Sequence, residues 1–588
     1  MMINCIDDRN VQLLVALLKT HQIKRVIVSP GTTNSLLIKS MQLDEFFQIY
    51  SAIDERSAAY MACGMAAESR EPVVITCTEA TAVRNYMPGL TEAFHRKLPV
   101  LAITGLHAYH QIGHLIPQVI DVCQSLSDAV KYRADLPVIR DDEDEWESAV
   151  KINKAIQALN HNGRGPAQIN LPYKANHGGF VKVDVSDVRG IHHFKCGDEL
   201  PEMLFGKIAI FAGAHVAWLE KEEKAIDEFC KNYNSVVFCD HSSNYRGKYR
   251  VLSSLLAAQK AKLSIFDDIE LLIHIGEEST DDATMRKMNQ VKEVWRVSPD
   301  GEIRDTFRKL TKVFQMNEDE FFYHYGSQRE TSDDCYLKEC LDVRKSIEEK
   351  MPKLPFSQFY VASHFAPRLP EDSVIHLGSS LTSRAWNLCE TPPTIINGGN
   401  AGCRGIDGTL SSLLGASKVN EERIHFGIVG DLAFFYDMTI LGNKHLTSNI
   451  RIVLINNGGG GLLIKAGAFP KEERYAHLTD EFVTARGHFI NHSQNVAKAF
   501  VKELGFEYLR AENEEEFANV WERFLSPNIA ERPMLLEIIT EDEKDWEAFE
   551  VMKSVMKDSK SQLKETAKQI LGEKGVQLTK NLVKKLGK

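Results

Sequence analysis

Short, almost wholly apolar runs recur along most of the chain, and they constrain its fold more than any other feature. Examples are "RVIV", "PVVIT", "VLAIT", "IAIFA" and "RIVLI", and stretches with helical spacing lie between them. Strands that are buried on both faces of a parallel sheet have this composition, and a helix between two such strands forms a right-handed crossover. The alternation therefore predicts an α/β protein built from doubly wound parallel sheets.

Polar, irregular stretches divide this pattern into three blocks. "DVSDVRGIHHFKCGDELPE" follows the first block, and "GSQRETSDDCYLKE" follows the second. We predict α/β domains at residues 1–185, 190–345 and 350–545, which suits a chain of 588 residues at about 150 residues per domain. Residues 546–588 are rich in Lys and carry Leu, Val and Ile at helical spacing, so we predict an amphipathic helical tail there.

Charge and cysteine usage limit the partners and the compartment. A net charge of -11 argues against general nucleic-acid binding, which needs a basic surface. No apolar run reaches membrane-spanning length, and the N-terminal stretch lacks the features of a signal peptide. The 11 Cys are scattered without metal-ligand spacing. We expect a cytoplasmic protein with reduced thiols that binds neither nucleic acid nor membrane.

Two consecutive apolar strands end in polar residues that suit a metal. "IHFGIVGD" ends in Asp431, and "NIRIVLINN" ends in Asn457, 26 positions later, before a run of glycines. Parallel strands joined by a helix end at the same edge of a sheet, so both side chains would lie there. Their oxygens suit Mg²⁺, and glycines let a diphosphate approach the backbone. Ordinary turns would give similar pairs, but the combination predicts a metal–diphosphate site.

Glu55 stands at the start of a helical pattern rich in small residues, "ERSAAYMACGMAAES". An acidic residue in a first helical turn complements the helix dipole, so a structural role would explain it. This stretch alone favours that structural role, although a catalytic carboxylate would also explain it. The local pattern leaves both interpretations open.

The segment from Asp431 to Asn457 resembles the thiamine-diphosphate-binding motif. The stretches "SPGTTN", "DERSAAYMACGMA", "CTEATAVRNYMPGLTEA", "GPAQINLPY" and "NAGCRGIDGTLSS" fall in the order expected of the MenD family, the 2-succinyl-5-enolpyruvyl-6-hydroxy-3-cyclohexene-1-carboxylate synthases of menaquinone synthesis. The resemblance covers roughly residues 10–545. It implies pyrimidine-binding, central and diphosphate-binding domains, thiamine diphosphate and Mg²⁺ as cofactors, and a homodimer or homotetramer with shared active sites.

The resemblance also assigns roles to individual residues. It implies that Mg²⁺ is bound by the side chains of Asp431 and Asn457 and by the carbonyl group of Gly459. It implies that Glu55 hydrogen-bonds the aminopyrimidine ring, where a carboxylic acid promotes removal of the C2 proton, and that Gln118 lies near the reacting carbon. The remaining contacts to the cofactor would come from Gly430, Leu432 and Ile406, and Ile406 would wedge the cofactor into its bent conformation.

The expected substrate residues are only partly retained. Ser380 and Arg384 match residues that face the 2-oxo acid. Thr33, His107 and Ala401 stand where the family has basic residues, and each change removes a clamp for an acceptor carboxylate. We therefore expect an altered acceptor pocket.

Arg404 has no counterpart in the family pattern. It could replace a lost guanidinium group from a new direction, or it could be a surface arginine. The prediction for it is a substrate contact, with the second interpretation left open.

These observations predict decarboxylation of a 2-oxo acid and transfer of the acyl carbanion to a changed acceptor. The alternatives are a true menaquinone-pathway synthase, a simple 2-oxo acid decarboxylase, and an enzyme like acetolactate synthase. "IFAGAHVAWLE" lacks a phosphate-binding glycine run, which disfavours a flavin site, and no strand is followed by GxGxxG, which disfavours a dehydrogenase. A non-catalytic scaffold would have no need of Glu55, Asp431 and Asn457.

Overall fold

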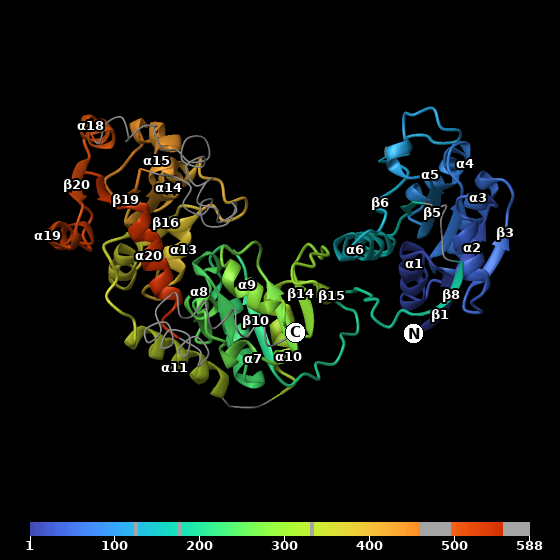
Figure 1. The fold of residues 1–588 in the computed structure, drawn as a ribbon, viewed down its shortest axis with the longest axis horizontal. Coiled ribbons are helices and arrows are strands. Elements are labelled where there is room, and N and C mark those ends of the chain that lie inside the picture. Colours follow the sequence, from blue (N-terminus) through green and yellow to red (C-terminus); the bar gives the residue numbers. More distant parts are fainter. Residues whose placement is uncertain (123–126, 173–178, 330–333, 459–494, 557–588) are drawn as a thin grey trace, which may run out of the picture. The chain divides into compact units, whose positions relative to one another are not determined.

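The computed structural model describes residues 1–122, 127–172, 179–329, 334–458 and 495–556 (Figure 1). It divides into two compact units. The N-terminal unit is Met1–Leu200 with Asp300–Gln315, and the C-terminal unit is Pro201–Pro299 with Met316–Lys588. The predicted α/β class with parallel sheets is confirmed in both units. The domain bounds at 185, 190, 345 and 350 stay a prediction.

A six-stranded parallel sheet forms the middle of the N-terminal unit, in the order β3-β2-β4-β5-β7-β6. The chain starts at β2 in the second position, moves to β3 at one edge, returns to β4 and then continues to the other edge, and parallel neighbours of this kind are joined by crossover connections. The strands are β2 (Arg25–Val28), β3 (Gln48–Ser51), β4 (Val73–Cys77), β5 (Val100–Leu106), β6 (Tyr132–Asp135) and β7 (Ala167–Pro172).

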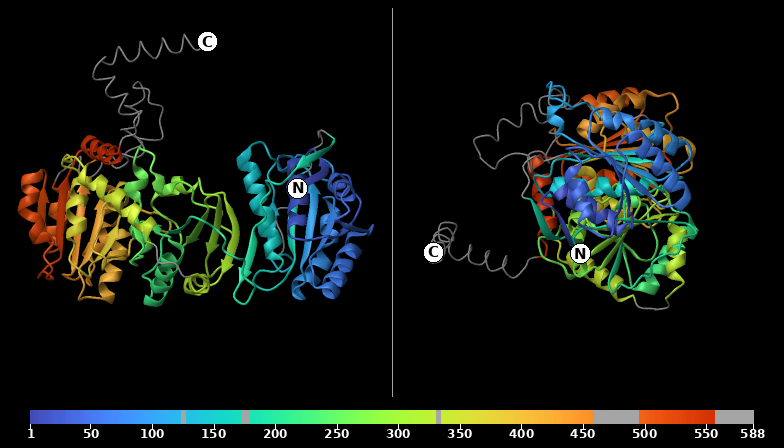
Figure 2. Two further views of the ribbon diagram at one scale, coloured as in Figure 1. Left: turned by 90° about the horizontal axis from the view of Figure 1, so that it is seen from below. Right: turned by 90° about the vertical axis from the view of Figure 1, so that its right-hand side faces the viewer.

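Helices cover both faces of this sheet (Figure 2). Alternate strand residues point to opposite faces, so Val74 packs in one core and Ile75 in the other. One face is covered by α1 (Arg9–Thr20), α2 (Ser35–Gln42) and α6 (Asp142–Ala158). The other is covered by α3 (Glu55–Ser69), α4 (Thr81–Asn85) and α5 (Met87–His95).

Some strands of the structure were not predicted from the sequence. β1 (Met2–Ile6) pairs antiparallel with β8 (Phe180–Asp184), where we expected only a polar start to the first helix. β9 (His192–Lys195) pairs in parallel with β15 (Leu310–Gln315) and lies inside the stretch interpreted as a linker. β8 and β9 have no buried residue, so they lack the continuous apolar composition of strands that are covered on both faces.

The C-terminal unit begins with parallel strands in the order β12-β11-β10-β13-β14. Their bounds are Ile208–Ala212 (β10), Val237–Cys239 (β11), Arg250–Leu252 (β12), Leu271–Ile275 (β13) and Glu293–Val297 (β14). The helices of this region are α7 (Glu220–Tyr233), α8 (Ser254–Ala258), α9 (Asp282–Met288), α10 (Glu318–Gly326) and α11 (Cys335–Glu349).

A second six-stranded parallel sheet follows, in the order β17-β16-β18-β19-β21-β20. Numbered within each sheet, this order is the same as in the N-terminal unit. Its strands are β16 (Val374–Leu377), β17 (Ile396–Asn397), β18 (His425–Gly430), β19 (Ile450–Asn456), β20 (Glu507–Ala511) and β21 (Met534–Ile539).

The helices around this sheet complete the described chain. α14 (Thr409–Val419), α15 (Asp431–Asp437) and α18 (Val496–Glu503) share one apolar core with β18 and β19. The others are α12 (Gln358–Phe365), α13 (Leu381–Asn387), α19 (Glu514–Phe524) and α20 (Asp542–Lys553).

The helical tail predicted at 546–588 lies mostly outside the described residues. Within them, α20 runs across position 546 and buries Asp545 completely. No helix in the described part of the chain is both long enough and apolar enough to cross a membrane.

Candidate cofactor and substrate site

Asp431 and Asn457 lie at the carboxyl ends of neighbouring strands, as predicted. β18 and β19 pair in parallel with Gly430 opposite Ile455, so the residues that follow them emerge at the same edge. Asp431 is buried at the start of α15, and its carboxylate accepts a hydrogen bond of 2.7 Å from the amide of Leu432. A cavity of about 140 Å³ lies at this edge. Its lining includes six predicted site residues: Ser380, Ile406, Gly430, Asp431, Leu432 and Asn457. Gly459 lies outside the described residues.

A buried carboxylate that the sequence did not reveal orients Asn457. Asp545 accepts hydrogen bonds from Nδ2 of Asn457 at 3.2 Å, from Oγ1 of Thr540 at 3.1 Å, and from the backbone amide and Nε2 of Gln358 at 2.8 and 3.0 Å. Burial raises the pKa of Asp545. Because Asn457 donates through its nitrogen, its acceptor oxygen lies on the side of the amide that faces away from Asp545.

Gln358 also lines this cavity, and its position is fixed in the same way. Its Nε2 donates to Asp545, and its buried Oε1 has no hydrogen-bond partner within the described residues. Leaving a buried acceptor unpaired costs about 1–3 kcal/mol. Gln358 and Asp545 are 187 positions apart, and each stands in an ordinary helix-start pattern, so no local signal could have paired them.

The donor atoms at this edge fit Mg²⁺ and a diphosphate. A carboxylate from Asp431 and the amide oxygens of Asn457 and Gln358 are hard oxygen ligands, which Mg²⁺ prefers while it keeps several waters or phosphate oxygens. Among the described residues, no group of three His, Cys, Asp or Glu side chains could hold a metal. At this edge of the sheet, the possible Mg²⁺ ligands are therefore a mixed set of carboxylate and amide oxygens.

Glu55 is the first residue of α3, but another residue caps that helix. The carboxylate of Asp54 accepts hydrogen bonds from the amides of Arg56 at 2.8 Å and Ser57 at 3.3 Å. Glu55 is half-buried and accepts a hydrogen bond of 3.0 Å from Nδ2 of Asn85. Asp54 supplies the side-chain cap and Glu55 is the acidic residue of the first helical turn, so this geometry is compatible with both interpretations of Glu55.

Thr33 closes a loop at the carboxyl edge of the N-terminal sheet. Its side chain is buried, and its hydroxyl group contacts the carbonyl oxygen of Gly105 and lies 2.6 Å from the hydroxyl group of Thr78. A Cβ on Gly105 would lie 2.5 Å from the carbonyl oxygen of Thr33, so the two loops are in close contact. The hydroxyl group of Thr33 is therefore engaged within the fold.

His107 is held by a buried carboxylate at the same edge. Nδ1 of His107 contacts Oε1 of Glu79, and the backbone amide of His107 donates to Oε2 at 3.1 Å. Glu79 is only 3% exposed, and a single Glu after a strand gives no sign of this role in the sequence. Gln118 is exposed in the loop after β5, with a left-handed backbone at φ 68°. The left-handed backbone of Ala80, at φ 65°, marks a strained turn just after Glu79.

The two residues predicted to contact the donor lie at the start of α13 and one turn further along it, and they line different cavities. Ser380 precedes the helix with φ 73° and ψ -128°, a strained conformation for a residue other than glycine. It lines the cavity beside Asp431 and Asn457, called the cofactor cavity below. Arg384 lines a separate cavity of about 490 Å³. There it forms an ion pair with Asp282, and Arg404 forms a second ion pair with the same carboxylate at 3.4 Å.

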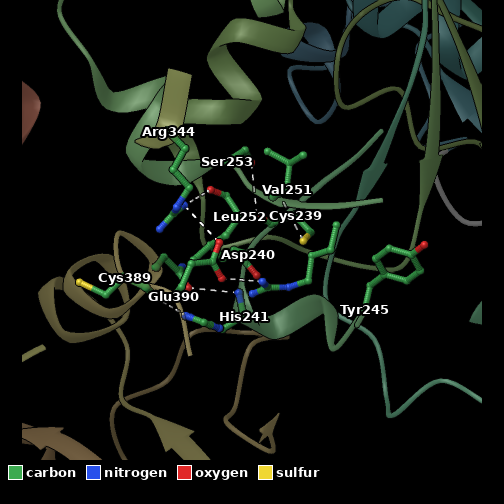
Figure 3. A network of polar contacts seen from close by, with 12 residues as sticks. Cys239, Asp240, His241, Tyr245, Val251, Leu252, Ser253, Arg344, Cys389 and Glu390 are labelled. Carbon is green, nitrogen blue, oxygen red and sulfur yellow. Dashed lines mark hydrogen bonds and ion pairs between the residues drawn. The ribbon is translucent and has the colours of Figure 1, made fainter. Parts of the chain in front are cut away.

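A buried polar network fixes α13 against the strands that begin the C-terminal unit. Oδ1 of Asn387 accepts a hydrogen bond of 3.2 Å from the amide of His241, and its Nδ2 donates to Oγ1 of Thr280 at 2.8 Å. Thr280 in turn donates to Asp240 at 2.9 Å. The ring of His241 lies 3.0 Å from the carbonyl oxygen of Cys389, directly beyond the helix (Figure 3).

Glu390 joins this network from the segment after α13. It forms ion pairs with Arg250 at 2.6 Å and Arg344 at 3.3 Å. Figure 3 shows Glu390 and His241 side by side below the strand end that carries Asp240. Burial alone would raise the pKa of Glu390, but the two guanidinium groups lower it overall. The network therefore holds the helix that carries Ser380 and Arg384 by charge as well as by hydrogen bonds.

Comparison with known proteins agrees with this geometry. Residues 9–125 match the family described as "Thiamine pyrophosphate enzyme, N-terminal TPP binding domain". The chain is 30% identical over 553 residues to the 2-succinyl-5-enolpyruvyl-6-hydroxy-3-cyclohexene-1-carboxylate synthase of Phocaeicola vulgatus, covering 92% of this chain and 97% of that protein. It is 29% identical over 573 residues to the synthase of the same name from Bacteroides thetaiotaomicron, covering 95% and 99%.

A more distant relative extends the same likeness. The Flavobacterium johnsoniae protein of that name is 27% identical over 477 residues, which covers 77% of this chain and 83% of that protein. The chain belongs to the 2-succinyl-5-enolpyruvyl-6-hydroxy-3-cyclohexene-1-carboxylate synthase family of thiamine-diphosphate-dependent enzymes, which decarboxylate a 2-oxo acid and transfer the resulting acyl carbanion to an acceptor.

Proposed function

We propose that the enzyme uses thiamine diphosphate with Mg²⁺ to decarboxylate a dicarboxylic 2-oxo acid, and that its acceptor differs from that of its named relatives. The single observation that carries the cofactor part is the cavity shared by Asp431, Asn457 and Gln358, with one buried acceptor oxygen left unpaired within the described residues. Thiamine diphosphate, when bound, supplies a carbanion at its C2 position and accepts the electron pair released as CO₂ departs.

The chain's own residues would bind the metal and orient the cofactor. Asp431 and Asn457 would bind Mg²⁺ by their side chains, with the carbonyl group of Gly459 as a third ligand. Asp545 would keep the amide oxygen of Asn457 directed at the metal, because it accepts the hydrogen bond from Nδ2. Ile406 would pack against the cofactor from the side of α14, and Gly430 and Leu432 would contact it from the end of β18.

Glu55 would act as the acid–base group that activates the cofactor. Its carboxyl group would share a proton with the aminopyrimidine ring, which allows the neighbouring amino group to remove the C2 proton. The hydrogen bond from Asn85 would keep the carboxyl group in place. Gln118 would lie near the reacting carbon.

Arg384 is the basic residue retained where the family holds the 2-oxo acid. A guanidinium group pairs well with a carboxylate, and such a charge-assisted bond is worth roughly 1.5–3 kcal/mol. A donor with a distal carboxylate, such as 2-oxoglutarate, benefits from this pairing, whereas pyruvate does not. Ser380 would contact the other end of the donor near the cofactor.

The acceptor should carry fewer carboxylates than isochorismate. The hydroxyl group of Thr33 is hydrogen-bonded within the fold, His107 is paired with Glu79, and Ala401 has no charge. An aldehyde, a ketone or a sugar derivative would suit such a pocket. The second candidate is the reaction that the relatives' names describe, and the identity over most of the chain favours it. A simple decarboxylase would release an aldehyde and need no acceptor.

The assembly would be a homodimer or a homotetramer with shared sites. The outer face of α3 supports this, because Tyr60 and Met61 are exposed there and a Cβ on Gly64 would meet nothing within 4 Å. Ile53, 86% exposed, lies just before Glu55. A second copy would cover these apolar groups and bring a cofactor to Glu55. A cytoplasmic location is part of the proposal, and it suits buried thiols such as Cys5, Cys63 and Cys77, which form no disulfide bond.

A CO₂-release assay tests the proposed function. The purified enzyme with thiamine diphosphate and Mg²⁺ is offered a panel of 2-oxo acids, alone and with isochorismate. We expect CO₂ release with a dicarboxylic donor, little consumption of isochorismate, and no release from Asp431→Ala. Efficient consumption of isochorismate would favour the reaction in the relatives' names, and an unimpaired Asp431→Ala variant would contradict the metal site.

A further inference from the structure

Asp282 engages both of the arginines that were singled out for the substrate. Its Oδ2 pairs with Nη2 of Arg384, and its Oδ1 lies 3.4 Å from Nη1 of Arg404. The carboxylate thus spans two guanidinium groups from different segments. The three side chains are 30–35% exposed, so solvent and small ligands can reach the group.

The backbone around Asp282 is fixed by its neighbours. Asp281 is buried and caps α9, with its Oδ1 accepting from the amide of Thr284 at 3.0 Å and its Oδ2 from Ser253 at 3.4 Å. Asp282 is therefore presented from a rigid helix start. Its carboxylate therefore stays within reach of both guanidinium groups, and a competing carboxylate would have to displace it from them.

Arg404 is held at the same place by more than the ion pair. Its Nη2 donates to the carbonyl oxygen of Ser279, and its backbone is left-handed at φ 53°. Its buried Nε has no hydrogen-bond partner within the described residues. A left-handed conformation is unfavourable for a residue with a side chain, and the contacts to Ser279 and Asp282 offset that cost.

The position of Arg384 connects this cluster to the chemistry. Ser380 lines the cofactor cavity, and Arg384 follows it by one turn of α13, which is about 6 Å along the axis. That separation is on the scale of a four- or five-carbon 2-oxo acid. The cavity around Arg384 also carries Arg286, Lys287 and Lys553, so it suits an anionic group.

We propose that Asp282 is a specificity-determining residue that occupies Arg384 and Arg404 in place of a substrate carboxylate. A dicarboxylic donor must displace Asp282 before its distal carboxylate can pair with Arg384. A monocarboxylic donor leaves the ion pairs intact. Asp282 therefore reduces the difference in affinity between dicarboxylic and monocarboxylic donors. It also halves the positive charge that the two arginines present to a substrate. This inference rests on the proposed role of Arg384 in donor binding.

The test compares Asp282→Asn with the wild type in the full-length enzyme loaded with thiamine diphosphate and Mg²⁺. Removing the charge while keeping the shape should lower KM for 2-oxoglutarate by about fivefold to tenfold, since a charge-assisted competitor is lost. The KM for pyruvate and both kcat values should change less than about twofold. Equal changes in KM for both donors, or no change, would overturn the inference.

Three further variants, together with melting curves, test whether the effect is specific to the charge of Asp282. Asp282→Ser should give the same split between donors, and melting curves should match the wild type. Asp267→Asn is the matched control, because Asp267 is similarly exposed at 28% and pairs with Lys262 at 2.9 Å away from Arg384. It should leave both KM values unchanged. In an Arg384→Gln background, Asp282→Asn should lose most of its effect on the dicarboxylic donor; an undiminished effect would contradict the proposed displacement.

A binding experiment separates this inference from the proposed function. Glutarate is titrated calorimetrically into the loaded wild type and the loaded Asp282→Asn variant. Tighter binding to the variant supports the role of Asp282 even if no 2-oxo acid in the panel is decarboxylated, an outcome that would reject the proposed function alone. Equal binding to both proteins, in an enzyme that does decarboxylate 2-oxo acids, overturns the role of Asp282 and leaves the proposed function standing.

Discussion

Glu55 and Asp545 show how differently two carboxylates are used within one chain. Glu55 is half-buried, and Asn85 donates to one of its carboxylate oxygens, Oε2, so that Oε1 can meet a ligand. Asp545 is fully buried and accepts four hydrogen bonds from protein groups. The first arrangement suits an acid–base group, and the second suits a group that orients its neighbours.

Glu55→Gln should keep cofactor binding and lose most turnover. The amide fills the same volume but cannot share a proton with the cofactor ring. We expect turnover to fall by at least about two orders of magnitude, as is typical for a positioned acid–base group. Steady-state kinetics with a thermal-shift titration of thiamine diphosphate would measure both effects. Near-normal turnover would return Glu55 to a structural role at the start of α3.

Asp545→Asn should weaken Mg²⁺ binding without touching the metal directly. The variant keeps the volume but can turn a donor toward Asn457, so the acceptor oxygen of Asn457 loses its fixed direction. Partners of metal ligands typically contribute about 10- to 100-fold in metal affinity, and we expect a loss in that range. Calorimetric titration of Mg²⁺ with thiamine diphosphate present measures it, and exposed Glu543→Gln on the same helix is the control. Unchanged affinity would show that Asn457 needs no such support.

At the scale of elements, the anchoring of α13 should make stability depend on acid pH. The pKa of Glu390 is lowered by Arg250 and Arg344 from its ordinary value of 4.5, so protonation favours the unfolded chain. The stabilisation is complete above that ordinary value and is lost as pH falls through the lower pKa of the folded state.

Melting curves from neutral pH to about pH 4 and below would reveal this dependence. Glu390→Gln should lower the melting temperature at neutral pH and flatten its decline in acid. Glu371→Gln, an exposed carboxylate in the same region, serves as the comparison. An equally steep decline in Glu390→Gln and in the wild type would assign the acid sensitivity to other carboxylates.

The strands that could be predicted from the sequence are those with apolar surroundings on both faces of the sheet. β4, β5, β18 and β19 are buried on both faces, so their composition alone identifies them. The polar ends of β18 and β19 could then be placed together, because parallel neighbours end at one edge. β8 and β9 have no buried residue, so the search for continuous apolar runs missed them, although Val181 and Val183 of β8 alternate with charged residues.

The residues that sequence reasoning missed act through contacts between distant segments. Asp545 reaches Asn457 across 88 positions, and Asp282 reaches Arg384 across 102. Glu79 lies beside His107 because β4 and β5 are neighbours, and a single Glu after a strand carries no signal by itself. A pattern read along one segment cannot report a pairing that only the fold creates.

At the scale of the whole molecule, Glu55 belongs to the N-terminal unit, and Asp431 and Asn457 belong to the C-terminal unit. The two six-stranded sheets have the same strand order, and each carries predicted site residues after the carboxyl ends of its strands. We propose that one subunit supplies Glu55 and its neighbour supplies the metal site, so that a two-fold dimer contains two identical sites.

Mixing two inactive variants tests this account most directly. In a mixed dimer of Glu55→Gln and Asp431→Ala, one site carries both substitutions and the other carries neither. Random exchange of subunits should therefore restore about one quarter of the wild-type CO₂ release, because half of the dimers are mixed and each has one intact site. Each variant alone should stay inactive. Native mass spectrometry confirms that the subunits have exchanged. If CO₂ release then fails to recover, the result contradicts a site built from Glu55 of one chain and Asp431 of another.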